Sequence, residues 1–183
     1  MVPRSFDSGG FVLLRDPVHG LVTFEGREGQ LIEQLLATRE VQRLRRVRQL
    51  GLASFVYPGA EHTRFAHALG AAYVMSRLLL RLRDRDYGMP RELRIDEEAT
   101  LDAVAAALVH DLGHGPFSHL FEDALPGARA HEDWTHDMIV DADTEIRGAL
   151  EAYSPGMAAR VGAMLRGSHR LPYLPSLVSG VFD

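Results

Sequence analysis

Hydrophobic and polar residues alternate in two short runs near the start of the chain. Residues 11–25 hold two β-prone runs that are separated by Asp16-Pro17 and Gly20. Turn residues between apolar runs are typical of a β-hairpin. The pattern therefore predicts an N-terminal arm and a β-hairpin within residues 1–25.

Beyond residue 25 the apolar residues recur with the period of an α-helix. Residues 29–51 carry them at helical spacing, and Gly51 is expected to cap the end of that stretch. Two further strong helices are predicted over 66–86 and 95–114, the second with Asp96 as its N-cap. Three more helical segments follow, at 131–142, 144–153 and 157–167. The predicted fold is all-α, a multi-helix core with a short N-terminal β-hairpin.

Residues 107–119, ALVHDLGHGPFSH, combine an apolar helix with a polar end. Within ten residues the segment carries His110, Asp111, His114 and His119. An unpaired buried carboxylate would be very costly, so Asp111 needs a partner. That partner is either a bound cation or a histidine in a structural hydrogen bond, and the segment alone leaves both readings open.

Other imidazoles and carboxylates lie in neighbouring segments of the predicted core. His62 and His67 flank the start of the helix predicted at 66–86, while Glu122 and His136 follow the polar end. The chain has no cysteine, which excludes thiolate sites and leaves His, Asp and Glu as ligands for any metal. This concentration of possible ligands favours a bound metal ion as the partner of Asp111.

Composition and charge indicate the broad class of protein but not its function. The chain has 183 residues, 46% of them hydrophobic and 25% charged, as in an ordinary globular domain. A formal net charge of −5 makes nucleic acid an improbable partner. No apolar run approaches the roughly 18 residues that a membrane helix needs. We expect a soluble cytoplasmic protein without a membrane partner.

Several motifs together resemble a known family. The segments HTRFAHALG, HDLGHGPFSH and WTHD are similar to those of the HD-domain superfamily of metal-dependent phosphohydrolases. Within it they resemble the deoxynucleoside triphosphate triphosphohydrolase branch, to which the sterile-alpha-motif and HD-domain dNTPases belong. RDPVHGLVTF and VQRLRRVRQLG add to the likeness, which covers roughly residues 12–137. The resemblance implies an HD domain over residues 26–183.

The resemblance implies a metal site made by His67, His110 and Asp111. A divalent ion such as Mn, Mg, Zn, Fe or Ni suits these ligand types. It also implies that Arg64 binds the α-phosphate of a nucleotide. The alternative for Arg64 is a surface arginine that pairs with Glu61.

Further matches imply an acid relay and a substrate pocket. His119 would protonate the leaving oxygen, with Glu122 orienting it and His136 completing the relay. On the substrate side, His114 would face the phosphates. The remaining matches, which would contact the deoxyribose, are Gln49 and Leu50.

The arginine-rich stretch 43–49 has two interpretations. It is either a solvated helix face or, because Gln42 and Arg45 match family positions, a nucleotide activator site. Ala37 and Val12 depart from the family at that site, which puts guanine-specific activation in doubt. His62 is expected near the site without a role. Three other histidines are interpreted as structural or surface residues: His19, His131 and His169.

The segment SLVSGVFD at the end of the chain resembles the lead-in to a family motif that carries a fourth ligand. Asp183 matches the first aspartate of that motif, and the ligating aspartate would lie two positions further on. We therefore expect the HD domain to be truncated at its C-terminal end and the chain to be a fragment with uncertain activity of its own.

The expected function is hydrolysis of a dNTP to a deoxynucleoside and triphosphate. Two alternatives remain open. One is an HD phosphohydrolase that acts on a nucleoside monophosphate, a cyclic nucleotide or an alarmone. The other is a non-catalytic module that binds nucleotide or metal. The resemblance also implies a homo-oligomer, either a dimer or a tetramer.

Overall fold

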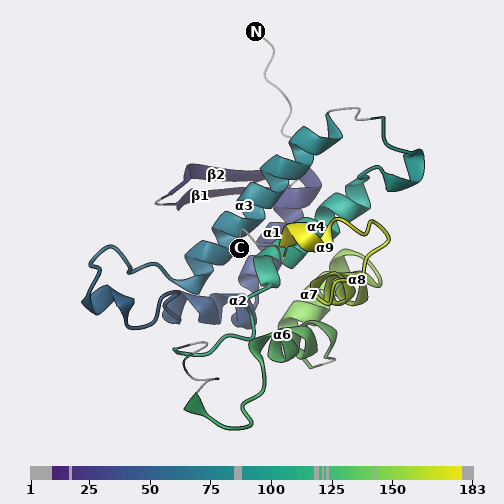
Figure 1. The fold of residues 1–183 in the computed structure, drawn as a ribbon. Helices are drawn as coiled ribbons and strands as arrows, with labels where there is room; N and C mark the ends of the chain where they lie inside the picture. The colour runs from purple at the N-terminus through teal and green to yellow at the C-terminus, as the bar shows by residue number, and fades with distance from the viewer. Residues whose placement is uncertain are drawn as a thin grey trace.

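The computed structural model describes residues 10–16, 18–84, 88–117, 120, 122, 124–141 and 143–178. In that part of the chain the fold is helical, with one two-stranded antiparallel sheet near the N-terminus, which confirms the predicted class (Figure 1). The elements are β1 (Gly10–Asp16), β2 (Gly20–Glu25), α1 (Gly26–Ala37), α2 (Arg39–Arg43), α3 (Arg64–Arg83), α4 (Glu97–Val109), α6 (His131–Val140), α7 (Glu145–Tyr153), α8 (Met157–Leu165) and α9 (Pro175–Val178). Short 3₁₀ turns lie at Leu44–Arg46, Ala53–Phe55 and Arg91–Leu93.

The hairpin forms where the alternating pattern predicts it. Val12 pairs with Phe24 in the antiparallel register, and both side chains are buried against the helices. A Cβ on Gly29 of α1 would lie 2.3 Å from the carbonyl oxygen of Gly10, so a glycine lets α1 approach the hairpin closely. At the turn, one carboxylate oxygen of Asp16 accepts hydrogen bonds from the backbone N–H groups of Val18 and His19.

The helical pattern of residues 29–51 does not give one continuous helix. α1 ends at Ala37 because Thr38 is extended (φ −72°, ψ 144°), and its hydroxyl donates to the carbonyl of Leu35. α2 and a 3₁₀ turn follow, and Val47 is extended again. Gly51 lies in a turn after these elements, with φ +54°, so its predicted role as a helix C-cap is wrong.

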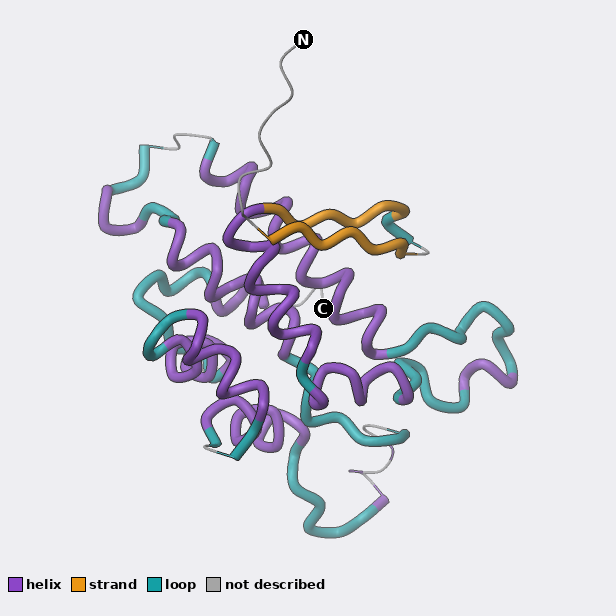
Figure 2. Tube along the Cα trace, turned by 180° about the vertical axis from the view of Figure 1, so that it is seen from behind, coloured by secondary structure: helices purple, strands orange, loops and turns teal. Residues whose placement is uncertain are grey.

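α4 occupies the centre of the helical array. Asp96 caps it as predicted, accepting a 2.8 Å hydrogen bond from the backbone N–H of Ala99. Every residue from Ala99 to Val109 is buried, because α4 packs against α3 on one side and α8 on another (Figures 1 and 2). A helix that is apolar on all sides requires such burial. Its C-terminal end consequently delivers the residues after Val109 into the interior.

α6, α7 and α8 pack with one another; α8 also packs on α4, and α7 packs on α1 and α2. They correspond to the three helices predicted at 131–142, 144–153 and 157–167. α9 packs on α4 and α8. None of the helices in the described ranges is both long and apolar enough to cross a bilayer.

Candidate active site

The polar end of segment 107–119 begins with a tight turn. α4 ends at Val109, His110 is its C-cap, and the N–H of His114 donates to the carbonyl of Asp111 at 3.2 Å. This turn, residues 110–114, is called the HD turn below. Because the helix stops here, consecutive side chains leave the helical spacing and can point to one place.

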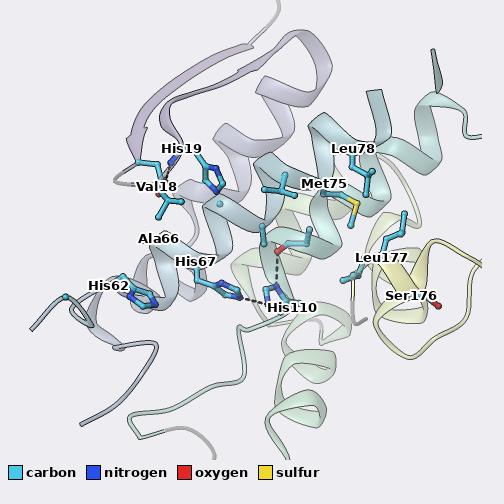
Figure 3. A pocket seen from close by; sticks show the side chains of 17 residues that line it. Val18, His19, His62, Ala66, His67, Met75, Leu78, His110, Ser176 and Leu177 are labelled. Carbon is cyan, nitrogen blue, oxygen red and sulfur yellow. Dashed lines mark hydrogen bonds between the residues drawn. The ribbon is translucent and has the colours of Figure 1, made fainter. Parts of the chain in front are cut away.

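His67, His110 and Asp111 come together between α3 and the HD turn. The two Nε2 atoms of His67 and His110 lie 3.2 Å apart (Figure 3). The carboxylate of Asp111 lies 3.3 Å from Nε2 of His110 and 3.8 Å from Nε2 of His67. The structure thus brings together the three side chains that the sequence predicts as metal ligands. That they bind a metal stays a prediction.

The donor atoms fit a divalent cation. Nδ1 of His110 lies 2.9 Å from the carbonyl oxygen of Ala107, and since a carbonyl only accepts, Nδ1 carries the proton. Nε2 then presents its lone pair to the cluster, as a ligating imidazole requires. Two metal–nitrogen bonds of about 2.1 Å at about 100° put the nitrogens about 3.2 Å apart, which matches the His67–His110 separation.

Arg64 pairs with Asp111 in the interior. Its guanidinium donates to Asp111 at 2.5 Å, and it is only 3% exposed. The alternative of a surface arginine paired with Glu61 is therefore wrong, and Arg48 pairs with Glu61 instead. Because Asp111 holds it, Arg64 acts on the cluster through that carboxylate. Its predicted contact with a phosphate stays a prediction.

The electrostatic setting keeps Asp111 ionised. Burial by itself raises the pKa of this carboxyl, but the hydrogen bond from His114 and the electrostatic interactions with His110 and Arg64 outweigh it. The pKa of Asp111 lies well below its usual range. Burial lowers the pKa of His114, against the opposing effect of Asp111, which favours a neutral imidazole.

Two residues that sequence reasoning missed hold the main chain of the HD turn. The guanidinium of Arg43 donates to the carbonyls of Leu112 and His114. This rules out a uniformly solvated arginine face for residues 43–49. Thr135 is 2% exposed, donates to the carbonyl of His110 at 3.1 Å and accepts from the N–H of Gly113 at 2.8 Å. The only prior signal was the threonine inside the WTHD motif.

His131 also belongs to the site, although the sequence suggested a structural or surface role. Its ring stacks on His114 with centroids 3.7 Å apart and planes inclined by 17°. Its Nδ1 lies 3.1 Å from the carboxylate of Glu122. Glu122 was predicted to orient His119, which lies outside the described residues, so that role stays a prediction.

The His114–Glu122–His131 group offers three potential ligand atoms close together. Face-to-face imidazoles are nevertheless poor partners for one ion, because each nitrogen lone pair lies in its own ring plane and the planes are nearly parallel. A single ion would lie out of the plane of at least one ring. The contacts describe a stacked and hydrogen-bonded chain better than a second metal site.

His136 faces a different neighbour. Its ring lies beside Gly162 of α8, and its Nδ1 is 3.8 Å from the carboxylate of Asp137. On α6, His131 and Thr135 are one helical turn apart and share the face toward the HD turn, whereas His136 is rotated from it. The role of His136 in an acid relay stays a prediction. Asp183, which matches the first aspartate of the C-terminal motif, lies outside the described residues.

Gln49 and Leu50 lie on the segment that runs beside the start of α3. The N–H of Gln49 donates to the carbonyl of His62, and the N–H of Arg64 donates to Val47. Among the described residues, the buried side-chain oxygen of Gln49 has no hydrogen-bond donor. Leu50 is 51% exposed. That Gln49 and Leu50 contact a deoxyribose stays a prediction.

A cavity of about 690 Å³ adjoins the metal-ligand candidates. His67 and His110 form one end of its wall, and apolar side chains of α3 and α9 such as Leu78 and Leu177 form the other (Figure 3). His19, which was taken for a structural or surface residue, also lines it. His62 lines it too, which agrees with its expected place near the site.

The proposed activator residues contact each other. Arg45 donates to the side chain of Gln42 at 2.7 Å, and its guanidinium lies 3.6 Å from the ring centroid of Phe65. Gln42 in turn donates to the carbonyl of Leu36. These contacts give both side chains structural roles, and activator binding by them stays a prediction.

Most of the chain is similar to known proteins. The HD domain family matches residues 64–171, a range that contains the three metal-ligand candidates. Protein YwfO of Bacillus subtilis is 39% identical over 171 residues, which is 93% of this chain and 37% of that protein. The deoxynucleoside triphosphate triphosphohydrolase SAMHD1 of Bos taurus is 41% identical over 126 residues, 68% of this chain and 20% of the relative. The chain thus spans well under half of these relatives.

Solved structures agree with the fold. A phosphohydrolase from Bacteroides thetaiotaomicron superposes with a TM-score of 0.75 and 32% identity, covering 94% of this chain and 39% of that one. A hypothetical protein from Aquifex aeolicus gives a TM-score of 0.72 and 33% identity, covering 94% and 43%. Both similarities extend over nearly all of the described elements.

Proposed function

Since the chain belongs to the HD-domain family, we propose that it forms the site of a metal-dependent phosphohydrolase that acts on a nucleotide. The convergence of His67, His110 and Asp111 beside a cavity of about 690 Å³ carries this proposal. Two imidazole nitrogens and one carboxylate within 3.8 Å of one another are the donors that such an ion uses.

In this proposal His67 and His110 hold the ion through Nε2, and Asp111 holds it through a carboxylate oxygen. A bound divalent ion supplies Lewis-acid chemistry, polarising a phosphoryl oxygen and lowering the pKa of a bound water. Arg64 keeps the Asp111 carboxylate ionised and in place. Its buried charge also adds positive potential where phosphate charge develops.

We propose a deoxynucleoside triphosphate as the substrate, cleaved to a deoxynucleoside and triphosphate. The name of the bovine relative supports this class of substrate. In this proposal Gln49 and Leu50 contact the deoxyribose, and the exposed side chain of Leu50 supports this role. His114 would act on the phosphates.

The acid step is proposed for the segment after the HD turn. His119 would give a proton to the leaving 5′-oxygen, so that the deoxynucleoside departs neutral. Glu122 and His136 would keep the proton on the correct nitrogen of that imidazole.

Hydrolysis of dGTP in the presence of Mn²⁺ tests the proposal. Purified chain should release deoxyguanosine and triphosphate in equal amounts, and Asp111→Asn should abolish the release. His169→Ala, which removes an imidazole away from the site, is the matched control. Release of monophosphate or inorganic phosphate would favour another nucleotide phosphohydrolase. No turnover with any dNTP, monophosphate, cyclic nucleotide or alarmone would contradict an enzymatic role for this chain.

We further expect a homo-oligomer, either a dimer or a tetramer. Exposed apolar side chains on the segment after Gln49, including Phe55 (83% exposed) and Val56 (72% exposed), offer surface for self-association. Light scattering coupled to size-exclusion chromatography measures the mass directly. A monomer at all concentrations would contradict this expectation.

A further inference from the structure

Beyond the metal-ligand candidates, a chain of contacts leads from α6 to Asp111. Glu122 contacts Nδ1 of His131 at 3.1 Å, and His131 stacks on His114 at 3.7 Å between ring centroids. His114 then reaches Asp111, with its Nε2 3.4 Å from a carboxylate oxygen. Each contact fixes the side chain that follows it.

His114 is only 2% exposed, so the residues packed around it, and not solvent, determine its orientation. A buried imidazole can turn about its side-chain bonds unless packing opposes it. The ring of His131 lies flat against it and blocks that rotation. Glu122 in turn holds His131, whose side chain is 13% exposed, by a charge-assisted contact.

The side chain of Thr135 in α6 makes a second contact at the same place. Thr135 lies one helical turn after His131 and bonds the carbonyl of His110 and the N–H of Gly113. The first turn of α6 therefore sets both the main chain of the HD turn and the side chain beneath it. A residue on this face of α6 can therefore alter the positions of the metal-ligand candidates without contacting the ion itself.

We propose that His131 is a positioning residue of the metal site: it fixes His114 by stacking, and His114 holds Asp111 in the orientation that binds the cation. The inference rests on the proposed metal site, and it assigns to the site a residue outside the predicted ligand, substrate and acid sets. Outer hydrogen-bonding partners of metal ligands contribute strongly to affinity.

Variants of His131 separate stacking from hydrogen bonding. His131→Ala removes both contacts. His131→Phe keeps the ring face on His114 and loses the bond to Glu122, and His131→Asn keeps a donor near Nδ1 and loses the ring. The control is His169→Ala. Circular dichroism and thermal unfolding establish that each variant is folded, and His131→Phe, the closest in shape, keeps the test valid if His131→Ala does not fold.

Affinity for Mn²⁺ is the first measurement, and it requires no turnover. We expect His131→Ala to bind Mn²⁺ about 10-fold to 100-fold more weakly than the wild type. His131→Phe should recover most of the affinity and His131→Asn little of it. Wild-type affinity in His131→Ala would overturn the proposal. So would a second equivalent of Mn²⁺ bound by the wild type and lost in His131→Ala, because His131 would then be a ligand.

Nitrogen-15 NMR of the metal-free protein is the second measurement. The His114 side chain should show one tautomer, with the proton on Nε2, and ring protons shielded by His131. In His131→Ala the shielding should disappear and the two tautomers should mix, whereas His131→Phe should retain the shielding. Unchanged His114 signals in His131→Ala would overturn the proposal. Failure of dNTP hydrolysis alone would count against the proposed function, and these two readouts would still decide the role of His131.

Discussion

The hydroxyl of Thr135 donates a hydrogen bond to the main-chain carbonyl of His110, and it is buried in doing so. The same oxygen accepts from the N–H of Gly113. A helix end that enters the interior leaves backbone groups that need partners, and here one side chain serves two of them. α6 is thereby tied to the residues that follow α4.

Replacement of Thr135 by valine should destabilise the chain by about 1–3 kcal/mol, because a buried donor and a buried acceptor lose their partner. Thr135→Ser keeps the hydroxyl and should cost less. Urea unfolding followed by circular dichroism measures both. Equal stability of the valine variant and the wild type would contradict the assigned role.

Gly113 should tolerate no side chain. An added Cβ would lie 2.0 Å from the carbonyl oxygen of His131 and 2.6 Å from the backbone nitrogen of Thr135. Neither backbone atom can move without displacing α6. We expect Gly113→Ala to cost about 3 kcal/mol or more. The control is Gly148→Ala in α7, where an added Cβ meets nothing within 4 Å and should stabilise or leave unchanged the unfolding midpoint. Similar midpoints for the two variants would refute this account of the HD turn.

Arg64 should be important for stability in the absence of metal. Arg64→Ala leaves the carboxylate of Asp111 buried without its ion-pair partner, at an expected cost of about 3–5 kcal/mol. Arg48→Ala, which breaks the exposed pair with Glu61, should cost about 1 kcal/mol or less. Added Mn²⁺ should raise the melting temperature of Arg64→Ala more than that of the wild type, since a cation at Asp111 compensates the lost charge. An equal rise in both would argue against binding at Asp111.

The sequence pattern predicts an element well where a single local signal determines where that element begins. Asp96 is an N-cap residue followed by acidic residues and an apolar run, and α4 begins where this signal places it. The pattern failed at Thr38, because the apolar spacing continues across it while its side chain and backbone form a local break. Tertiary contacts of residues 47–49 with 62–64, which no local pattern reports, fix the chain after that break.

In the site, too, residues inside recognisable motifs could be predicted, whereas residues placed by tertiary packing could not. His67, His110 and Asp111 were found from motifs because each lies inside a recognisable segment. Arg43 and His131 were missed because their partners are main-chain carbonyls and a stacked ring, which depend on the packing of α2 and α6. A charged residue in an arginine-rich stretch and a histidine at a helix start carry no local sign of such contacts.

Stability should depend on pH through Glu28 in α1. Burial raises the pKa of its carboxyl above the usual 4.5, against the opposing hydrogen bond of Ser76. The folded state then binds this proton more tightly than the unfolded state, so the contribution is present below pH 4.5 and is lost as the pH rises through the folded pKa. Glu28→Gln should therefore raise the melting temperature at pH 7 and leave it unchanged near pH 4. Glu33→Gln, exposed on the same helix, should leave the melting temperature unchanged at both pH values. A gain of equal size at both pH values would contradict burial as the cause.

The metal content of the purified chain tests the central claim most directly. After loading with Mn²⁺ and removal of excess ion, elemental analysis should find about one equivalent per wild-type chain. His110→Ala and Asp111→Asn should lose it, and the matched control His169→Ala should retain it. No bound ion in the wild type, or an equivalent that persists in both His110→Ala and Asp111→Asn, would contradict a metal site at His67, His110 and Asp111.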